Sequence, residues 1–208
     1  GMIVDLTTAP QLSSFPFQDV VEGLARARKT VTTFYGDVHS TQYTSTADAR
    51  WTDKDQWRWY NALAHGVNVE GFNVNLTACK TMAFSDYWWA RSHQGDRWAP
   101  TDNMRFFGKL QSWLKGSGIF SETGRQVFFI QLNGQHSPIH TDFDPLKVPE
   151  ELRAPGEFIW LTPPDRPKTL TVGGQAAPWC CWFDHFVPHG TSPEADTRWS
   201  LRVDGVFA

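Results

Sequence analysis

His140 and Asp142 are the residues of this sequence whose types and spacing most clearly predict chemistry. They are two positions apart, so on a β-strand both side chains lie on one face, a few ångströms apart. His189 follows 49 residues after His140 and is the third candidate ligand. Two imidazoles and one carboxylate on one side of an octahedral metal leave three positions open, which suits Fe(II) that binds a substrate and O₂ together. The three residues are therefore predicted to form a metal site.

A second group of polar residues follows the last histidine. Arg198 comes nine residues after His189, and Ser200 faces the same way as Arg198 if this segment is a strand. A guanidinium beside the metal would hold a carboxylate through two parallel hydrogen bonds, with the hydroxyl assisting. Arg202 has the same strand parity and is the alternative anchor. Its other interpretation is an ion pair with the nearby Asp204 at the rim of a barrel.

Other histidines compete for the role of the distal ligand. His185 lies four residues before His189 and remains an alternative to it. His189 is preferred because of its spacing to Arg198 and because Gly190 follows it. His136 lies in a stretch rich in turn residues and is interpreted as a surface residue.

The first pair of ligands also has alternatives. A His-x-Asp pair alone is more often an exposed strand end, or a hydrogen bond that stabilises a turn, than half of a metal site. Asp144 could replace Asp142 if the strand carried a bulge. The joint presence of His189 and of Arg198-x-Ser200 reverses this balance in favour of a metal site.

Together, His140-x-Asp142, His189 and Arg198-x-Ser200 resemble the Fe(II)/2-oxoglutarate-dependent dioxygenases, and their spacing is similar to that of the prolyl-hydroxylase-like branch. The resemblance covers about two-fifths of the chain. It implies a double-stranded β-helix jelly roll in which His140, Asp142 and His189 are the catalytic iron ligands. It also implies that 2-oxoglutarate binds the iron and places its distal carboxylate on Arg198 and Ser200. O₂ would then be consumed as 2-oxoglutarate is decarboxylated to succinate and the substrate is hydroxylated.

The sequence departs from that branch at one point. Its members often carry a tyrosine on the strand before the His-x-Asp pair to hydrogen-bond the cosubstrate. All four tyrosines of this chain lie upstream of that strand, at Tyr35, Tyr43, Tyr60 and Tyr87. Gln131 and Asn133 occupy roughly the expected place, and we expect them to contact the cosubstrate instead.

The elements that position these residues are short β-strands in the last part of the chain. β-rich runs over 126–132, 157–161, 168–172, 179–183 and 197–203 alternate with turn residues at 133–134, 163–165, 173–174 and 188–190. This pattern predicts a jelly roll. The expected fold class is therefore mainly β with flanking helices (α+β), with residues 126–208 as the metal-binding core.

Residues 2–125 carry the better helix candidates and are expected to buttress the jelly roll and to form the substrate mouth. Helices are predicted at about 20–27, 52–63 and 102–116, the last capped by Asp102 and ended by Gly116. No stretch is rich enough in linker residues to divide the chain, so residues 1–208 are expected to form a single domain. Seven of the 11 tryptophans fall in this upstream part, where packing against the sheet is their main interpretation.

Composition narrows the functional classes. The 19 basic and 22 acidic residues give a net charge of −3, which argues against a broad surface for double-stranded nucleic acid. No apolar run approaches the roughly 20 residues of a membrane span. Gly1 precedes Met2 and is set aside as a remnant of tag removal, and no signal peptide is predicted. Three cysteines, an odd number, favour a reducing cytoplasm over a disulfide framework.

These features predict an Fe(II)- and 2-oxoglutarate-dependent oxygenase that hydroxylates a small molecule or a protein side chain, so the expected partner is a small-molecule or peptide substrate. One alternative is a cupin-like metalloenzyme that uses no 2-oxoglutarate. Another is a non-catalytic, aromatic-rich binding module. The sequence does not specify the substrate or the oligomeric state.

Overall fold

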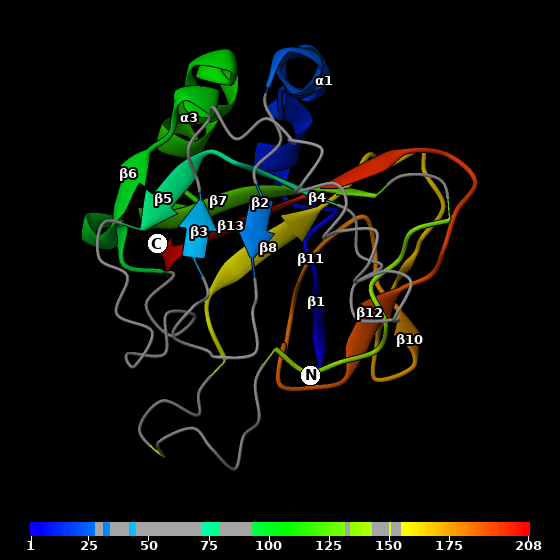
Figure 1. The fold of residues 1–208 in the computed structure, drawn as a ribbon. Coiled ribbons are helices and arrows are strands. Elements are labelled where there is room, and N and C mark those ends of the chain that lie inside the picture. Colours follow the sequence, from blue (N-terminus) through cyan, green and yellow to red (C-terminus); the bar gives the residue numbers. More distant parts are fainter. Residues whose placement is uncertain are drawn as a thin grey trace.

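Two antiparallel β-sheets form the body of the protein (Figure 1). The computed structural model describes residues 1–27, 31–33, 42–44, 72–79, 93–131, 134–142, 150 and 155–208. The larger sheet has the strand order β1-β11-β8-β13-β7-β4 and the smaller one the order β10-β9-β12. Two-stranded sheets β2-β3 and β5-β6 complete the described strands.

The strands of the larger sheet are β1 (Ile3–Asp5), β4 (Phe72–Asn75), β7 (Phe120–Gln131), β8 (Phe158–Leu161), β11 (Cys180–Phe183) and β13 (Arg198–Phe207). Those of the smaller sheet are β9 (Leu170–Val172), β10 (Gln175–Ala176) and β12 (His189–Thr191). The remaining strands are β2 (Val31–Thr33), β3 (Gln42–Thr44), β5 (Thr77–Cys79) and β6 (Trp98–Pro100). The helices are α1 (Phe17–Arg26) and α3 (Gly108–Gly116), with 3₁₀ turns at Pro10–Ser14, Gly95–Arg97 and Asp102–Phe106.

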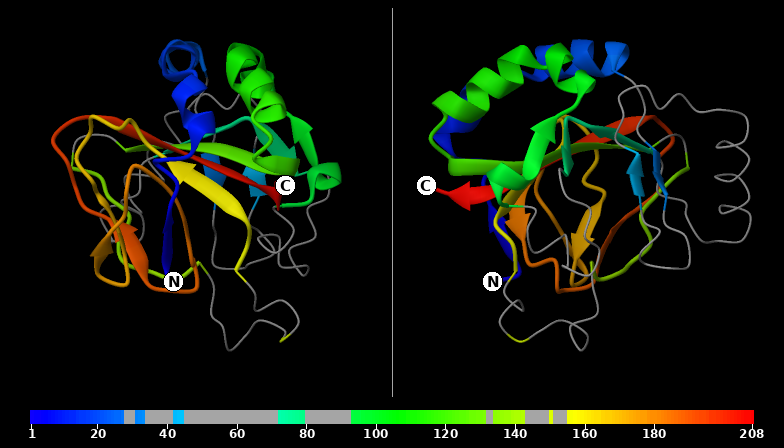
Figure 2. Two further views of the ribbon diagram at one scale, coloured as in Figure 1. Left: turned by 180° about the vertical axis from the view of Figure 1, so that it is seen from behind. Right: turned by 60° about the vertical axis from the view of Figure 1, so that its left-hand side comes forward.

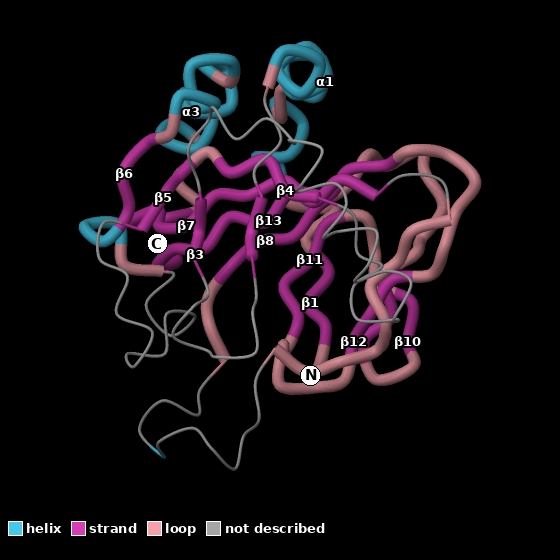
Figure 3. The backbone as a smooth tube through the Cα atoms, in the orientation of Figure 1, coloured by secondary structure: helices cyan, strands magenta, loops and turns pink. Residues whose placement is uncertain are grey.

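The elements lie in layers. Figure 2 shows α1 and α3 over one face of the larger sheet, with the smaller sheet on the other side. The tube in Figure 3 shows the same separation of helices from strands. The described part of the chain thus has the mainly β, helix-flanked jelly-roll architecture that the sequence predicts.

The side chains of β8 point alternately into two hydrophobic cores, one on each face of the larger sheet. Ile159 and Leu161 point to the helix side and join the core built with α1 and α3. Phe158 and Trp160 point the other way and pack with β9 in the core between the sheets. Because successive side chains of a strand face opposite sides, this strand is buried on both faces. Burying a side chain of this size stabilises the fold by about 1.5–3 kcal/mol.

The two helices pack closely through a glycine. Gly23 of α1 lies against Phe107, where a β-carbon would come within 2.5 Å of the ring. Val20 is fully buried on the same helix, whereas Val21 is 50% exposed. The predicted helix over 20–27 is thus present as α1.

The prediction of one continuous helix from Asp102 is wrong. Asp102 begins a 3₁₀ turn without capping it through its side chain, and α3 starts only at Gly108. Between them, Phe107 has φ −127° and ψ 42°, which leaves helical geometry and buries its ring under α1. Leu110 and Leu114 are buried as expected. The helix predicted at 52–63 lies outside the described residues.

The five predicted strands of the jelly roll are present, and two of them are longer than predicted. β7 begins at Phe120 and β13 continues to Phe207, because the two strands pair along most of their lengths. The turn at Gly173 and Gly174 has φ values of 56° and 78°, the positive angles that a two-residue hairpin needs. The turn predicted at 188–190 is wrong, since His189 begins strand β12. The boundary at 125/126 stays a prediction.

The described tryptophans serve mainly in packing. Trp113 of α3 is buried and donates its indole N–H to the carbonyl of Gln11 at 2.9 Å. Trp98 and Trp160 are also buried. The other upstream tryptophans lie outside the described residues: Trp51, Trp57, Trp59, Trp88 and Trp89.

Among the described helices, none is long and apolar enough to cross a membrane.

The burial of Cys180 and Cys181 on β11 can be tested through the reactivity of their thiols. Burial raises the pKa of each thiol to about 12, so both are protonated and unreactive near neutral pH. In a Cys79→Ser variant, which removes the third cysteine, we expect no reaction with a disulfide reagent at about pH 8 and two reacting thiols after denaturation. The pKa of these thiols in the folded protein lies above the ordinary value of 9.0. The contribution of the buried thiols to the free energy of unfolding is therefore complete below about pH 9 and falls as the pH rises toward about 12. Fast reaction of the native protein would contradict the packing.

Candidate metal centre

A backbone bridge brings His140 and His189 together. His140 donates its N–H to the carbonyl of His189 at 2.9 Å, and His189 returns a hydrogen bond to the carbonyl of His140 at 2.8 Å. This antiparallel pair sets the two residues directly opposite each other, and their rings lie 4.6 Å apart between centroids. A separation of 49 residues in sequence therefore becomes direct contact in space.

Both imidazoles are oriented in the same way. Nδ1 of His140 lies 2.6 Å from the carbonyl oxygen of Pro138, and Nδ1 of His189 lies 2.8 Å from that of Val187. A carbonyl can only accept, so each Nδ1 carries the proton. Each ring thus commits Nδ1 to the main chain and turns Nε2 toward Asp142, which is the orientation of a metal-binding histidine.

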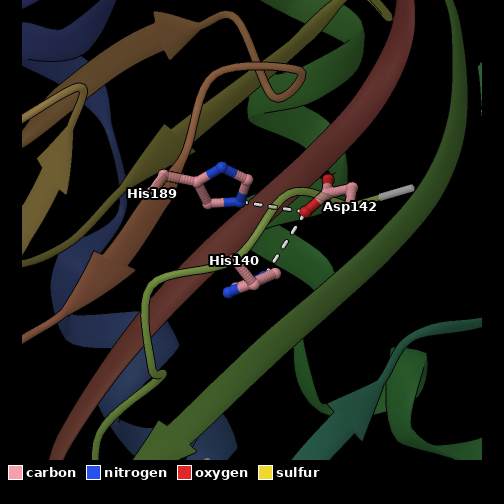
Figure 4. Close-up of side chains that lie close together, drawn as sticks. All are labelled: His140, Asp142 and His189. Atoms are coloured by element: carbon pink, nitrogen blue, oxygen red, sulfur yellow. Dashed lines mark ion pairs between the residues drawn. The ribbon is translucent and has the colours of Figure 1, made fainter. Parts of the chain in front are cut away.

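Asp142 completes the group (Figure 4). Its Oδ1 lies 2.9 Å from Nε2 of His189 and 3.5 Å from Nε2 of His140. The exposed fractions of the side chains are 40% for His140, 23% for Asp142 and 7% for His189. The site is therefore open on the side of His140 and closed on that of His189.

The donor set fits a divalent metal. The ligand atoms of His140, Asp142 and His189 all lie within 4.8 Å of one another. Two ligands at right angles on a metal, each at about 2.1 Å, are about 3 Å apart, which is close to the observed separations from Oδ1. Two imidazole nitrogens and one carboxylate oxygen on one side suit Fe(II) with open positions.

The surroundings of Asp142 keep it ionised. Burial alone would raise its pKa, but hydrogen bonds with His140, His185 and His189 and the charge of Arg202 hold the pKa well below its usual range. The carboxylate is therefore ready to act as a metal ligand.

His185 and Arg202, the alternatives to His189 and Arg198, both contact the other oxygen of Asp142. His185 is fully buried, and its Nδ1 contacts Oδ2 of Asp142 at 3.0 Å, outside the group of three. Arg202 donates from Nε and Nη2 to Asp204 and from Nη1 to Oδ2 of Asp142. The ion pair suggested by the sequence is thus present, and it leaves Arg202 engaged by two carboxylates. Asp144 lies outside the described residues.

Arg198 reaches the strand of His189 through Gln131. Its Nε donates to Oε1 of Gln131 at 2.9 Å, and Nη2 donates to the carbonyls of Gln135 and Ser192. Gln131 in turn exchanges hydrogen bonds with the hydroxyl of Thr191. These contacts fix the plane of the guanidinium.

Ser200 and Asn133 are the remaining expected site residues. Ser200 lies between Arg198 and Arg202 on one face of β13 and is half-buried. Asn133 lies outside the described residues. His136 is half-buried, and its Nδ1 is buried without a hydrogen-bond partner among the described residues.

Two residues that support the candidate site, Thr191 and His185, were not assigned this role from the sequence. Thr191 connects the arginine network to β12, and its position two residues after His189 on a strand would have been the signal for it. The sequence indicates His185 only as an alternative ligand, although a histidine beside a carboxylate can equally orient it.

Comparison with known proteins gives distant matches. No protein-family model and no curated protein matches the chain. The chain is similar to solved structures of Fe(II)-dependent oxygenases. A 2OG-Fe(II) oxygenase family oxidoreductase from Burkholderia pseudomallei is 11% identical with a TM-score of 0.38, over 97% of this chain and 92% of that one. A Pseudomonas putida prolyl-4-hydroxylase is 14% identical with a TM-score of 0.32, over 92% and 98%.

A third match is a prolyl hydroxylase from Trichoplax adhaerens, solved with a peptide fragment of the hypoxia inducible factor oxygen degradation domain. It is 11% identical with a TM-score of 0.31, over 97% of this chain and 94% of that one.

Gly190 controls how closely the two histidine segments approach. A β-carbon at this position would lie 2.6 Å from the carbonyl oxygen of Ser137 and 3.0 Å from the amide nitrogen of Ile139. Gly190→Ala should therefore push the His140 segment away and weaken Mn(II) binding by about tenfold or more, as other changes that disturb ligand orientation do. Calorimetric titration with Mn(II) measures this.

Gly108→Ala is the matched control, because a β-carbon there meets no atom within 4 Å. Unchanged Mn(II) affinity in a folded Gly190→Ala protein would show that the close approach is not needed.

Proposed function

We propose that the protein is an Fe(II)- and 2-oxoglutarate-dependent oxygenase that hydroxylates a small molecule or a protein side chain. The observation that carries the proposal is the convergence of Nε2 of His140, Oδ1 of Asp142 and Nε2 of His189. Both rings already have Nδ1 committed to carbonyls, so their remaining nitrogens are aimed at one point. His140, Asp142 and His189 would hold the Fe(II).

Arg198 is the proposed anchor for the distal carboxylate of 2-oxoglutarate. Thr191 is two residues beyond His189 on β12, or about 6.6 Å along the strand. Hydrogen bonds connect Thr191 to Gln131 and Gln131 to Arg198. This network therefore begins close enough to the proposed metal ligands for a five-carbon dicarboxylate on the metal to reach it. Ser200, on the same face as Arg198, would assist.

In this proposal Gln131 contributes by holding the arginine. Its Oε1 accepts from Nε of Arg198, and its amide nitrogen donates to the hydroxyls of Ser137 and Thr191. The guanidinium is therefore presented in a fixed plane, which lowers the entropy lost on binding a carboxylate. In this proposal Gln131 supports the arginine and does not itself contact the cosubstrate.

With iron and 2-oxoglutarate bound, the site would supply oxidative chemistry in which one atom of O₂ enters succinate, CO₂ leaves and the other atom enters the substrate as a hydroxyl group. The residues of the chain bind and orient the reactants. The ring of Phe183 lies 5.0 Å from that of His189 and would shield the closed side of the site from water.

An anaerobic titration tests the proposal directly. Adding Fe(II) and 2-oxoglutarate to the protein should produce a weak visible charge-transfer band, and O₂ should then yield succinate with a suitable substrate. Screening amino acids, peptides and metabolites for succinate formation would identify the substrate class. Metal binding without any band or stabilisation by 2-oxoglutarate would favour a cupin-like enzyme. Absence of metal binding would favour a binding module.

The role of Arg198 gives a specific prediction. Arg198→Met should weaken 2-oxoglutarate binding by about 10- to 100-fold, the loss expected for a hydrogen bond to a charged group worth 1.5–3 kcal/mol. Binding of Mn(II) alone should be unchanged, because Arg198 is not in the ligand group. Calorimetry of both ligands measures the two effects separately.

Arg166→Met is the control, since the side chain of Arg166 forms an exposed pair with Asp196 at 3.6 Å. Loss of Mn(II) binding in Arg198→Met, with 2-oxoglutarate binding retained, would show that the role is wrongly assigned.

A further inference from the structure

The two carboxylate oxygens of Asp142 lie in different surroundings. Oδ1 faces the Nε2 atoms of His140 and His189. Oδ2 contacts Nδ1 of His185 at 3.0 Å and Nη1 of Arg202 at 3.3 Å. A carboxylate can give a metal one oxygen or two, and this choice decides how many positions remain for other ligands.

The protonation of His185 follows from its second nitrogen. The amide N–H of Gly156 donates to Nε2 of His185 at 2.8 Å, so Nε2 accepts and carries no proton. A neutral imidazole holds one proton, which is then on Nδ1 and is donated to Oδ2 of Asp142. Trp182 donates its indole N–H to the carbonyl of Gly156 at 2.8 Å and fixes this peptide from the other side.

Packing holds His185 and Arg202 in place. The His185 ring is 1% exposed and meets the ring of Phe158 edge-on, at 5.6 Å and 87°. The guanidinium of Arg202 lies 3.9 Å from the centroid of the same phenylalanine and is paired with Asp204. Neither donor can leave Oδ2 without losing these contacts.

We propose that His185 is a positioning residue that, together with Arg202, keeps Oδ2 of Asp142 away from the metal. Asp142 then offers a single oxygen, and the positions needed for 2-oxoglutarate and O₂ stay free. This inference rests on the proposed function, because it concerns the metal that His140, Asp142 and His189 would hold.

Two amide substitutions separate this role from simple packing. In His185→Asn the side-chain amide lies near the position of Nδ1 and can still donate to Asp142. In His185→Gln the amide lies near the position of Nε2, so it can meet the N–H of Gly156 but not Asp142. We expect His185→Asn to bind Mn(II) within about threefold of the wild type and His185→Gln to bind 10- to 100-fold more weakly, the usual effect of removing a group that orients a ligand.

The readouts are Mn(II) affinity by calorimetry, the absorption spectrum of the Co(II)-loaded protein and the melting temperature of the metal-free protein. The Co(II) spectrum of His185→Gln should change, because a released Oδ2 alters the ligand set. His93→Gln is the matched control, since His93 is outside the contacts of Asp142. If His185→Asn fails to fold, His185→Gln against the control still decides the outcome.

Equal Mn(II) affinity and equal Co(II) spectra for the wild type and His185→Gln would overturn this inference and leave the proposed function intact. Equal weakening of both amide variants, in step with their melting temperatures, would also overturn it, because it would show a packing role only. If the wild type bound no Mn(II), the proposed function would fail first and this inference with it.

Discussion

The reciprocal pair of hydrogen bonds between the backbones of His140 and His189 is the constraint on which the candidate site depends. The bridge sets the two rings opposite each other, and Gly190 makes room for it because any β-carbon there would strike the backbone of residues 137–139. Asp142, two residues along, then reaches both rings. The three candidate ligands are thus brought together by main-chain geometry.

The remaining polar groups are supported by the larger sheet. β13 carries Arg198, Ser200 and Arg202 on one face, while Leu201 and Val203 on the other face are fully buried in the core under the helices. A shift of one residue in the register of β13 would exchange these two faces. The hydrophobic packing of the helix layer therefore also sets the register in which the charged residues point toward the smaller sheet.

The core strands and the pairing of His140 with Asp142 could be predicted because both depend on local alternation. His189 lies 49 residues away and is indicated only by its place in the joint pattern with Arg198 and Ser200. The period of two predicted His140 and Asp142 as neighbours on a strand, whereas the structure has an isolated bridge at His140 and a bend at Asp142. The same rule correctly aligned Arg198 with Ser200 on β13. Contacts between distant segments could not be predicted in this way. The edge strand β1, the contact of His185 with Asp142 and the break in the helix at Phe107 all depend on residues that meet only after folding.

The place of β13 in the larger sheet has a consequence for how the protein folds. This strand lies between β7 and β8, so its pairs join residues such as Arg198 with Gln131 and Leu201 with Leu161. Such non-local contacts slow folding, because long loops must close before any pairing is gained. The arginine network and the contacts of Arg202 can form only once this central strand is inserted, so the site is expected to be among the last features to mature during folding.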